Sequence, residues 1–157
     1  MSWEHFDKPW NQVKSEIIFN QLPVLVVKNV TKIAQSGAII RYLTNLTKML
    51  PDNDILAAKA DSIFETAHEM SFPLNPTINF AVGAEFEKAK NTIVENIMGR
   101  LQNFENILNS TSNPSFFLGG KPFYCDFCVY HHLLLLRLLD SNIFNKFSNL
   151  DQLMNSK

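Results

Sequence analysis

The second half of the chain contains a segment, at about residues 124–139, that is apolar on nearly every side of a helix. A helix of this kind is stable in water only when other helices surround it. The segment is too short to span a bilayer, and it carries His131, His132 and Arg137. The sequence therefore predicts a helical bundle built around this segment.

Helical patterns also fill the rest of this half. A break is predicted at residues 72–76, because Pro73 and Pro76 cannot donate backbone hydrogen bonds. The predicted elements around the central segment are helices at about 55–70 and 84–108, a loop at 110–114, and a short amphipathic piece around Phe147, Leu150 and Leu153.

Before residue 50 the pattern changes to short β-branched runs, whereas residues 1–20 show no clear periodicity. Residues 22–27 and 31–34 predict two strands that pair as a hairpin. Ser36 is predicted to cap a helix, since apolar residues follow it at helical spacing. The polar run after Pro51 marks a boundary. The predicted fold class is α+β and mostly α, with a hairpin-plus-helix unit over 1–50 and an all-helical unit over 51–157.

The composition excludes several kinds of partner. The chain has 157 residues, of which 46% are hydrophobic, and its formal net charge is −1. Nucleic acid and membrane are not expected as partners, because there is no excess of Lys and Arg to bind phosphates. The start of the chain does not resemble a signal peptide, and two cysteines are too few for a disulfide framework. A cytoplasmic location is expected.

Three motifs occur in order along the chain. They are Trp10-x-x-x-Lys14 followed by Gln21-Leu22-Pro23, then Gln35-Ser36, and finally Phe117-Leu118-Gly119-Gly120 before Asp126. In this order and spacing the chain resembles the glutathione transferases, most closely their sigma class. The resemblance implies a partial thioredoxin-like glutathione-binding domain at 1–50 and the family's all-helical C-terminal domain at 51–157. It also implies detoxification chemistry, with glutathione as co-substrate, a small electrophile as second substrate, a homodimer and no metal.

The resemblance implies roles for residues that would hold glutathione. The family's proline at the position of Pro23 is cis, and it turns the N–H and C=O of Leu22 outward to pair with the cysteinyl part of glutathione. Gln21 belongs to the same binding segment. Ser36, with Gln35 beside it, would hold the γ-glutamyl carboxylate at a helix start.

Three further residues complete the set implied by the resemblance. Trp10 and Lys14 would hold the glycine carboxylate of glutathione. Glu65 falls where sigma-like members place an acid that reaches the amine of glutathione bound to the partner subunit. That family residue is usually Asp, so Glu65 is one methylene longer.

The chain departs from the family pattern in two places. The family's catalytic Tyr or Ser lies on a strand before the tryptophan, so the chain is expected to be truncated there, as well as before the last helix. No catalytic residue is assigned, because Tyr42, Tyr124 and Tyr130 are predicted in helices. Phe123 also replaces a Ser or Thr that forms a capping box with the aspartate.

These departures leave two other hypotheses open. One is a catalytically silent family member that serves as a structural or assembly module, and the other is a truncated product that does not fold alone. Cys125-x-x-Cys128 with His132 could place three ligands on one helix face. No second ligand group follows it, so no metal or redox site is assigned.

Overall fold

The computed structural model describes residues 9–155. The chain forms two compact units, and the boundary between them in the sequence lies between Lys48 and Met49. The sequence places the boundary close by, at residue 50. Each unit has its own secondary structure and is described by itself.

The first unit begins with three short helical turns, α1 (Trp10–Val13), η2 (Lys14–Glu16) and η3 (Ile18–Asn20). Each is too short to leave a periodic pattern in the sequence, which explains why no element was predicted there. A hairpin follows, and its last strand leads into a helix.

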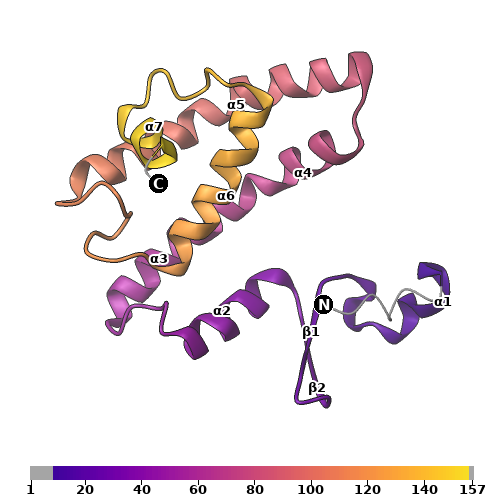
Figure 1. Ribbon diagram of the computed structural model, residues 1–157. Coiled ribbons are helices and arrows are strands. Elements are labelled where there is room, and N and C mark those ends of the chain that lie inside the picture. The colour runs from indigo at the N-terminus through magenta and orange to yellow at the C-terminus, as the bar shows by residue number, and fades with distance from the viewer. Residues whose placement is uncertain (1–8, 156–157) are drawn as a thin grey trace. The chain divides into compact units, whose positions relative to one another are not determined.

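The predicted hairpin is confirmed. Strands β1 (Val24–Val27) and β2 (Thr31–Ala34) pair antiparallel along their whole length. Residues 28–30 connect them, and Lys28 and Asn29 have positive φ angles of 51° and 57°. Two consecutive left-handed residues match the right-handed twist of paired strands, so this tight turn suits the hairpin. Helix α2 (Ser36–Thr47) follows β2 directly (Figure 1).

The second unit is entirely helical in the part that the structure describes. Its helices are α3 (Asp54–Glu69), α4 (Ser71–Phe80), α5 (Gly83–Ser110), α6 (Tyr124–Leu139) and α7 (Ser148–Asn155). Figure 1 shows α6 running between the α3–α4 pair and α5. The mostly helical fold with a two-stranded hairpin was predicted correctly.

Helix α6 occupies the centre of the bundle, as its composition predicts. Val129, Leu133 and Leu136 are fully buried. The helix is not enclosed on every side, however, because Phe127 and Leu138 are exposed. One apolar face of α6 therefore meets solvent in this unit.

The break predicted at residues 72–76 is wrong, because these residues form part of α4. Pro73 lies in the first turn, where a backbone N–H has no intrahelical acceptor and its absence costs nothing. Pro76 lies further inside the helix. The break falls one turn earlier, at Met70 between α3 and α4.

The start of α6 is organised by the carboxylate of Asp126. Its Oδ1 accepts the N–H of Phe117 at 2.8 Å, and its Oδ2 accepts the N–H of Phe123 at 2.8 Å. The bond from the N–H of Phe123 to Asp126 is one half of a capping box. The other half is missing, as the sequence predicts, because a phenyl ring cannot accept the N–H of Asp126 in return. The N–H of Asp126 bonds instead to the carbonyl of Phe123 at 3.1 Å.

Glu105 plays a similar part for α7. Its buried carboxylate accepts the backbone N–H groups of Asn149 and Leu150, each at 3.0 Å, and the hydroxyl of Ser148 at 3.3 Å. These donors lie in the first turn of α7, where backbone N–H groups lack helical partners. An acid near the C-terminal end of α5 therefore anchors the start of a later helix.

Within residues 9–155, no helix combines the length and the apolar composition needed to cross a membrane.

Candidate functional site

The predicted glutathione-binding residues, except Glu65, all belong to the first unit. Trp10 lies in α1 and Lys14 begins η2, one helical turn later. Both residues are exposed.

The segment before β1 has the predicted backbone conformation. The Leu22–Pro23 peptide bond is cis, as predicted. Leu22 is exposed, and the strand β1 begins immediately after Pro23, at Val24.

Gln35 forms the turn from β2 into α2. Its φ of 72° and ψ of 122° lie outside the regions that L residues favour. Its amide nitrogen donates to the side-chain oxygen of Gln21 at 3.4 Å. The structure therefore brings together two predicted site residues that are distant in sequence. Unfavourable backbone conformations of this kind cluster at functional sites.

The capping role predicted for Ser36 needs correction. Gln35 is the N-cap and Ser36 is the first helical residue, and no side chain caps this helix. The first intrahelical bond runs from the N–H of Ile39 to the carbonyl of Gln35, at 3.0 Å. The N–H groups of Ser36, Gly37 and Ala38 precede that bond and have no acceptor within the helix. This end of α2 therefore has the polarity that attracts an anion.

Glu65 lies in α3, in the helical unit, and its side chain is exposed. Its negative charge acts on Cys128 of α6. Glu65 therefore belongs to the second unit, whereas the other predicted site residues belong to the first unit.

The three tyrosines lie in helices, as predicted: Tyr42 in α2, and Tyr124 and Tyr130 in α6. The hydroxyl of Tyr124 donates to Oδ1 of Asp61 at 2.6 Å, which ties α6 to α3. This contact gives Tyr124 a structural role.

Neither cysteine is a reactive thiol at neutral pH. Burial, with the nearby charge of Asp126, raises the pKa of Cys125 far above its ordinary value. Burial, with the charge of Glu65, raises the pKa of Cys128 to about 12. Nucleophilic attack and metal ligation both require the thiolate. Across residues 9–155, no group of three His, Cys, Asp or Glu side chains is placed to hold a metal ion.

His132 is a buried titratable group, 5% exposed, in the second half of α6. Its Nδ1 lies 2.8 Å from the carbonyl oxygen of Cys128, so this nitrogen carries the proton and donates it. Burial lowers the pKa of His132, and the charges of His131 and His68 lower it further, whereas the bond to Cys128 opposes the shift.

We expect this histidine to make the stability of the protein depend on pH. Because its pKa is lower when folded, the unfolded chain binds the proton more readily, and stability falls as the pH drops through about 6.5, by at most about 1.4 kcal/mol per pH unit. Urea unfolding at pH 7.5 and pH 5.5 measures the loss. His132→Gln should reduce it strongly, whereas the exposed His131→Gln should reduce it only slightly, through loss of the charge that acts on His132. An equal pH dependence in wild type and His132→Gln would contradict this assignment.

Comparisons with known proteins show the family to which the chain belongs. A family model described as "Glutathione S-transferase, C-terminal domain" matches residues 68–156, more than half of the chain. Glutathione S-transferase P 10 of Caenorhabditis elegans is 28% identical over 141 residues, which cover 90% of this chain and 64% of that protein. Glutathione S-transferase 2 of Onchocerca volvulus is 28% identical over 140 residues, with 88% and 65% covered.

A solved structure shows the same fold. The pi-class glutathione S-transferase of Onchocerca volvulus superposes with a TM-score of 0.79 at 28% identity, covering 94% of this chain and 71% of that one. The chain thus spans about two thirds of the length of the curated relatives it matches.

Proposed function

Because this chain belongs to the glutathione S-transferase family, we propose that it binds glutathione with residues of its first unit. The main support is the turn at Gln35, which leads directly into the N–H groups at the start of α2 that have no acceptor within the helix. The γ-glutamyl carboxylate is an anion that these groups and the hydroxyl of Ser36 can hold. Gln21 contacts Gln35 and so belongs to the same surface.

The remaining assignments follow the extended shape of glutathione. Leu22 is exposed beside β1 and suits the cysteinyl unit, because an extended peptide can pair with a strand edge. Trp10 and Lys14 supply an N–H and a positive charge for the glycine carboxylate. Glu65 is proposed to act on glutathione bound to the partner subunit of a homodimer.

We propose that the reaction is the family's conjugation. The thiol of glutathione loses its proton to solvent water, the thiolate forms a bond from sulfur to the electrophilic carbon, and the leaving group departs with its electron pair. The proposal includes a small electrophile as second substrate, a detoxifying role and a cytoplasmic location. The sigma-class assignment is also a proposal, since the relatives named above carry the designations P and pi.

Isothermal titration of glutathione into the protein tests the binding site. Ser36→Ala is expected to weaken binding about tenfold or more, because a hydrogen bond to a charged group contributes about 1.5–3 kcal/mol. Thr47→Ala is a matched control, since this hydroxyl lies at the far end of α2 and bonds the carbonyl of Leu43. Unchanged affinity in Ser36→Ala would remove Ser36 from the site.

A further inference from the structure

A cleft lies on the helical unit between the first half of α3, the end of α5 and the loop that follows α5. Its volume is about 420 Å³, which falls within the range of about 300–1,000 Å³ of small-molecule sites. All of its lining residues belong to the second unit. They combine apolar side chains, hydroxyl groups and an ammonium group, and a ligand has to match all three.

The hydroxyl groups of the cleft can only accept hydrogen bonds from a ligand. Ser110 donates its proton to the carbonyl of Ile107 at 2.7 Å, and Thr111 donates to that of Leu108 at 2.8 Å. The oxygens keep their lone pairs, but their protons are already used. Both residues stand at the C-terminal end of α5, where the helix dipole is negative. This wall of the cleft therefore suits a positively charged donor.

The α3 wall of the cleft has the opposite character. Among the described residues that line the cleft, Lys59 is the one that carries a charge. It is exposed, and its flexible four-carbon stem lets the ammonium group adjust to a ligand. An anionic group is expected at this wall and a cationic group at the α5 wall. The two walls together match a zwitterion.

Apolar side chains lie between these polar groups. Leu56 of α3 is 40% exposed, and Ile107 of α5 is half-buried. Both line the cleft, so an apolar part of the ligand would remove their surface from water, which is favourable. The zwitterion should therefore carry an apolar side chain.

We propose that this cleft binds an α-amino acid with an apolar side chain, such as leucine. Its ammonium group donates to the hydroxyl oxygens of Ser110 and Thr111, and its carboxylate accepts from Lys59. Its side chain packs on Leu56 and Ile107. None of the residues assigned to glutathione lines the cleft, so the inference does not rest on the proposed function.

Titration of L-leucine into the ¹⁵N-labelled 157-residue chain, followed by NMR, tests the proposal. Saturable shifts are expected at the amides of Ser62, Thr111 and Gly119, which line the cleft. Three analogues each lack one part of the ligand. 4-Methylpentanoate lacks the ammonium group and should bind about tenfold more weakly. Alanine lacks most of the apolar side chain and should also lose about tenfold. Leucinamide lacks the carboxylate and should lose about two- to fivefold, because an exposed ion pair is weak.

Charge and hydroxyl variants identify the binding groups. Lys59→Gln should bind leucine and leucinamide equally, because only leucine has the carboxylate that Lys59 recognises. Lys146→Gln is the matched control, since this exposed lysine lies outside the cleft, and it should keep the preference for leucine. Thr111→Val should weaken leucine binding at least threefold. Thr92→Val should not, because this hydroxyl lies outside the cleft on α5 and bonds the carbonyl of Lys88.

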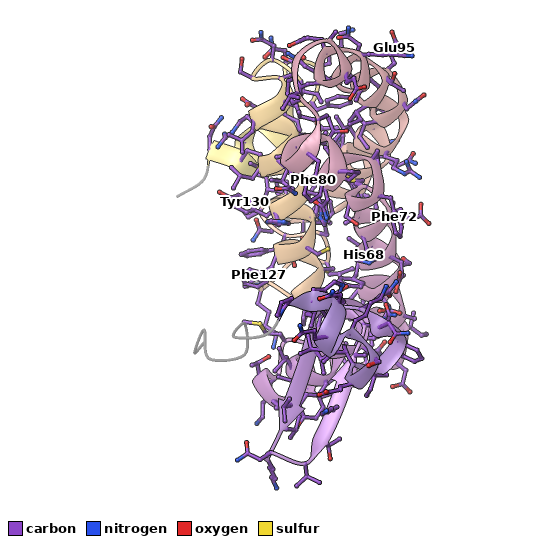
Figure 2. The ribbon with its side chains drawn as sticks, turned by 90° about the vertical axis from the view of Figure 1, so that its right-hand side faces the viewer. His68, Phe72, Phe80, Glu95, Phe127 and Tyr130 are labelled. Atoms are coloured by element: carbon purple, nitrogen blue, oxygen red, sulfur yellow. The ribbon has the colours of Figure 1, made fainter. Side chains whose placement is uncertain are left out.

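The proposal is overturned if binding does not saturate, or if 4-methylpentanoate or leucinamide binds as tightly as leucine. It is also overturned if Lys59→Gln keeps the preference for leucine. Largest shifts at Phe72 and Phe80 would contradict it too, because these exposed rings project from α4, as Figure 2 shows, and do not line the cleft. If Thr111→Val does not fold, as judged by circular dichroism, the analogues with the wild type still decide.

Discussion

Replacing Asp126 with alanine is expected to lower the free energy of unfolding of the helical unit by about 2–5 kcal/mol. The substitution leaves the N–H groups of Phe117 and Phe123 buried without acceptors, and each such group costs about 1–3 kcal/mol. Part of the cost is offset, because burial raises the pKa of Asp126 and shows that the charged form is itself unfavourable there.

Urea unfolding followed by circular dichroism measures this effect. Asp151→Ala is the matched control, because this exposed aspartate of α7 accepts a bond from the side chain of Asn155 and should contribute less than about 1 kcal/mol. Equal losses in the two variants would mean that Asp126 does not anchor the start of α6.

The second large effect concerns conjugation. The 157-residue chain is expected to conjugate glutathione to an aryl halide about ten- to a hundredfold more slowly than the Onchocerca volvulus relative. A free thiol has a pKa near 8.5, and a hydrogen bond of about 1.5–3 kcal/mol to the sulfur raises its thiolate population by that factor. None of the three tyrosines is assigned to donate this hydrogen bond, because Tyr124 bonds Asp61 and because Tyr42 and Tyr130 lie in helices. Ser2 lies outside the described residues.

Release of halide at saturating glutathione measures this rate for both proteins side by side. A rate equal to that of the relative would show that a hydroxyl of this chain activates the sulfur after all. Glutathione binding without measurable turnover would favour the alternative of a catalytically silent structural module. An unfolded chain would support the hypothesis of a product that cannot fold alone.

Local patterns were sufficient to predict most of the fold. The hairpin and α6 follow from side-chain periodicity and composition, which depend on neighbouring residues. The helix through Pro73 and Pro76 was missed, because a proline in a first turn looks like a break until the helix start is known. The role of Glu105 was missed because α7 follows far later in the sequence, and no local pattern links the two.

The backbone conformation of the candidate site was largely predictable from the sequence. The cis Leu22–Pro23 bond and the helix after Gln35 were both anticipated. The N-cap was placed one residue late, because Ser36 has strong cap propensity and a glutamine at positive φ has no sequence signal. The hydrogen bond between Gln21 and Gln35 depends on how η3 and β2 pack together, so the sequence could not reveal it.

A glutathione titration of the ¹⁵N-labelled chain, followed residue by residue by NMR, tests the central claim most directly. The predicted result is saturable shifts concentrated at the amides of Leu22, Ser36 and Gly37, because these N–H groups would bond the ligand. Saturable shifts confined to residues 49–155, or no saturable shift in the first unit, would contradict glutathione binding at this site.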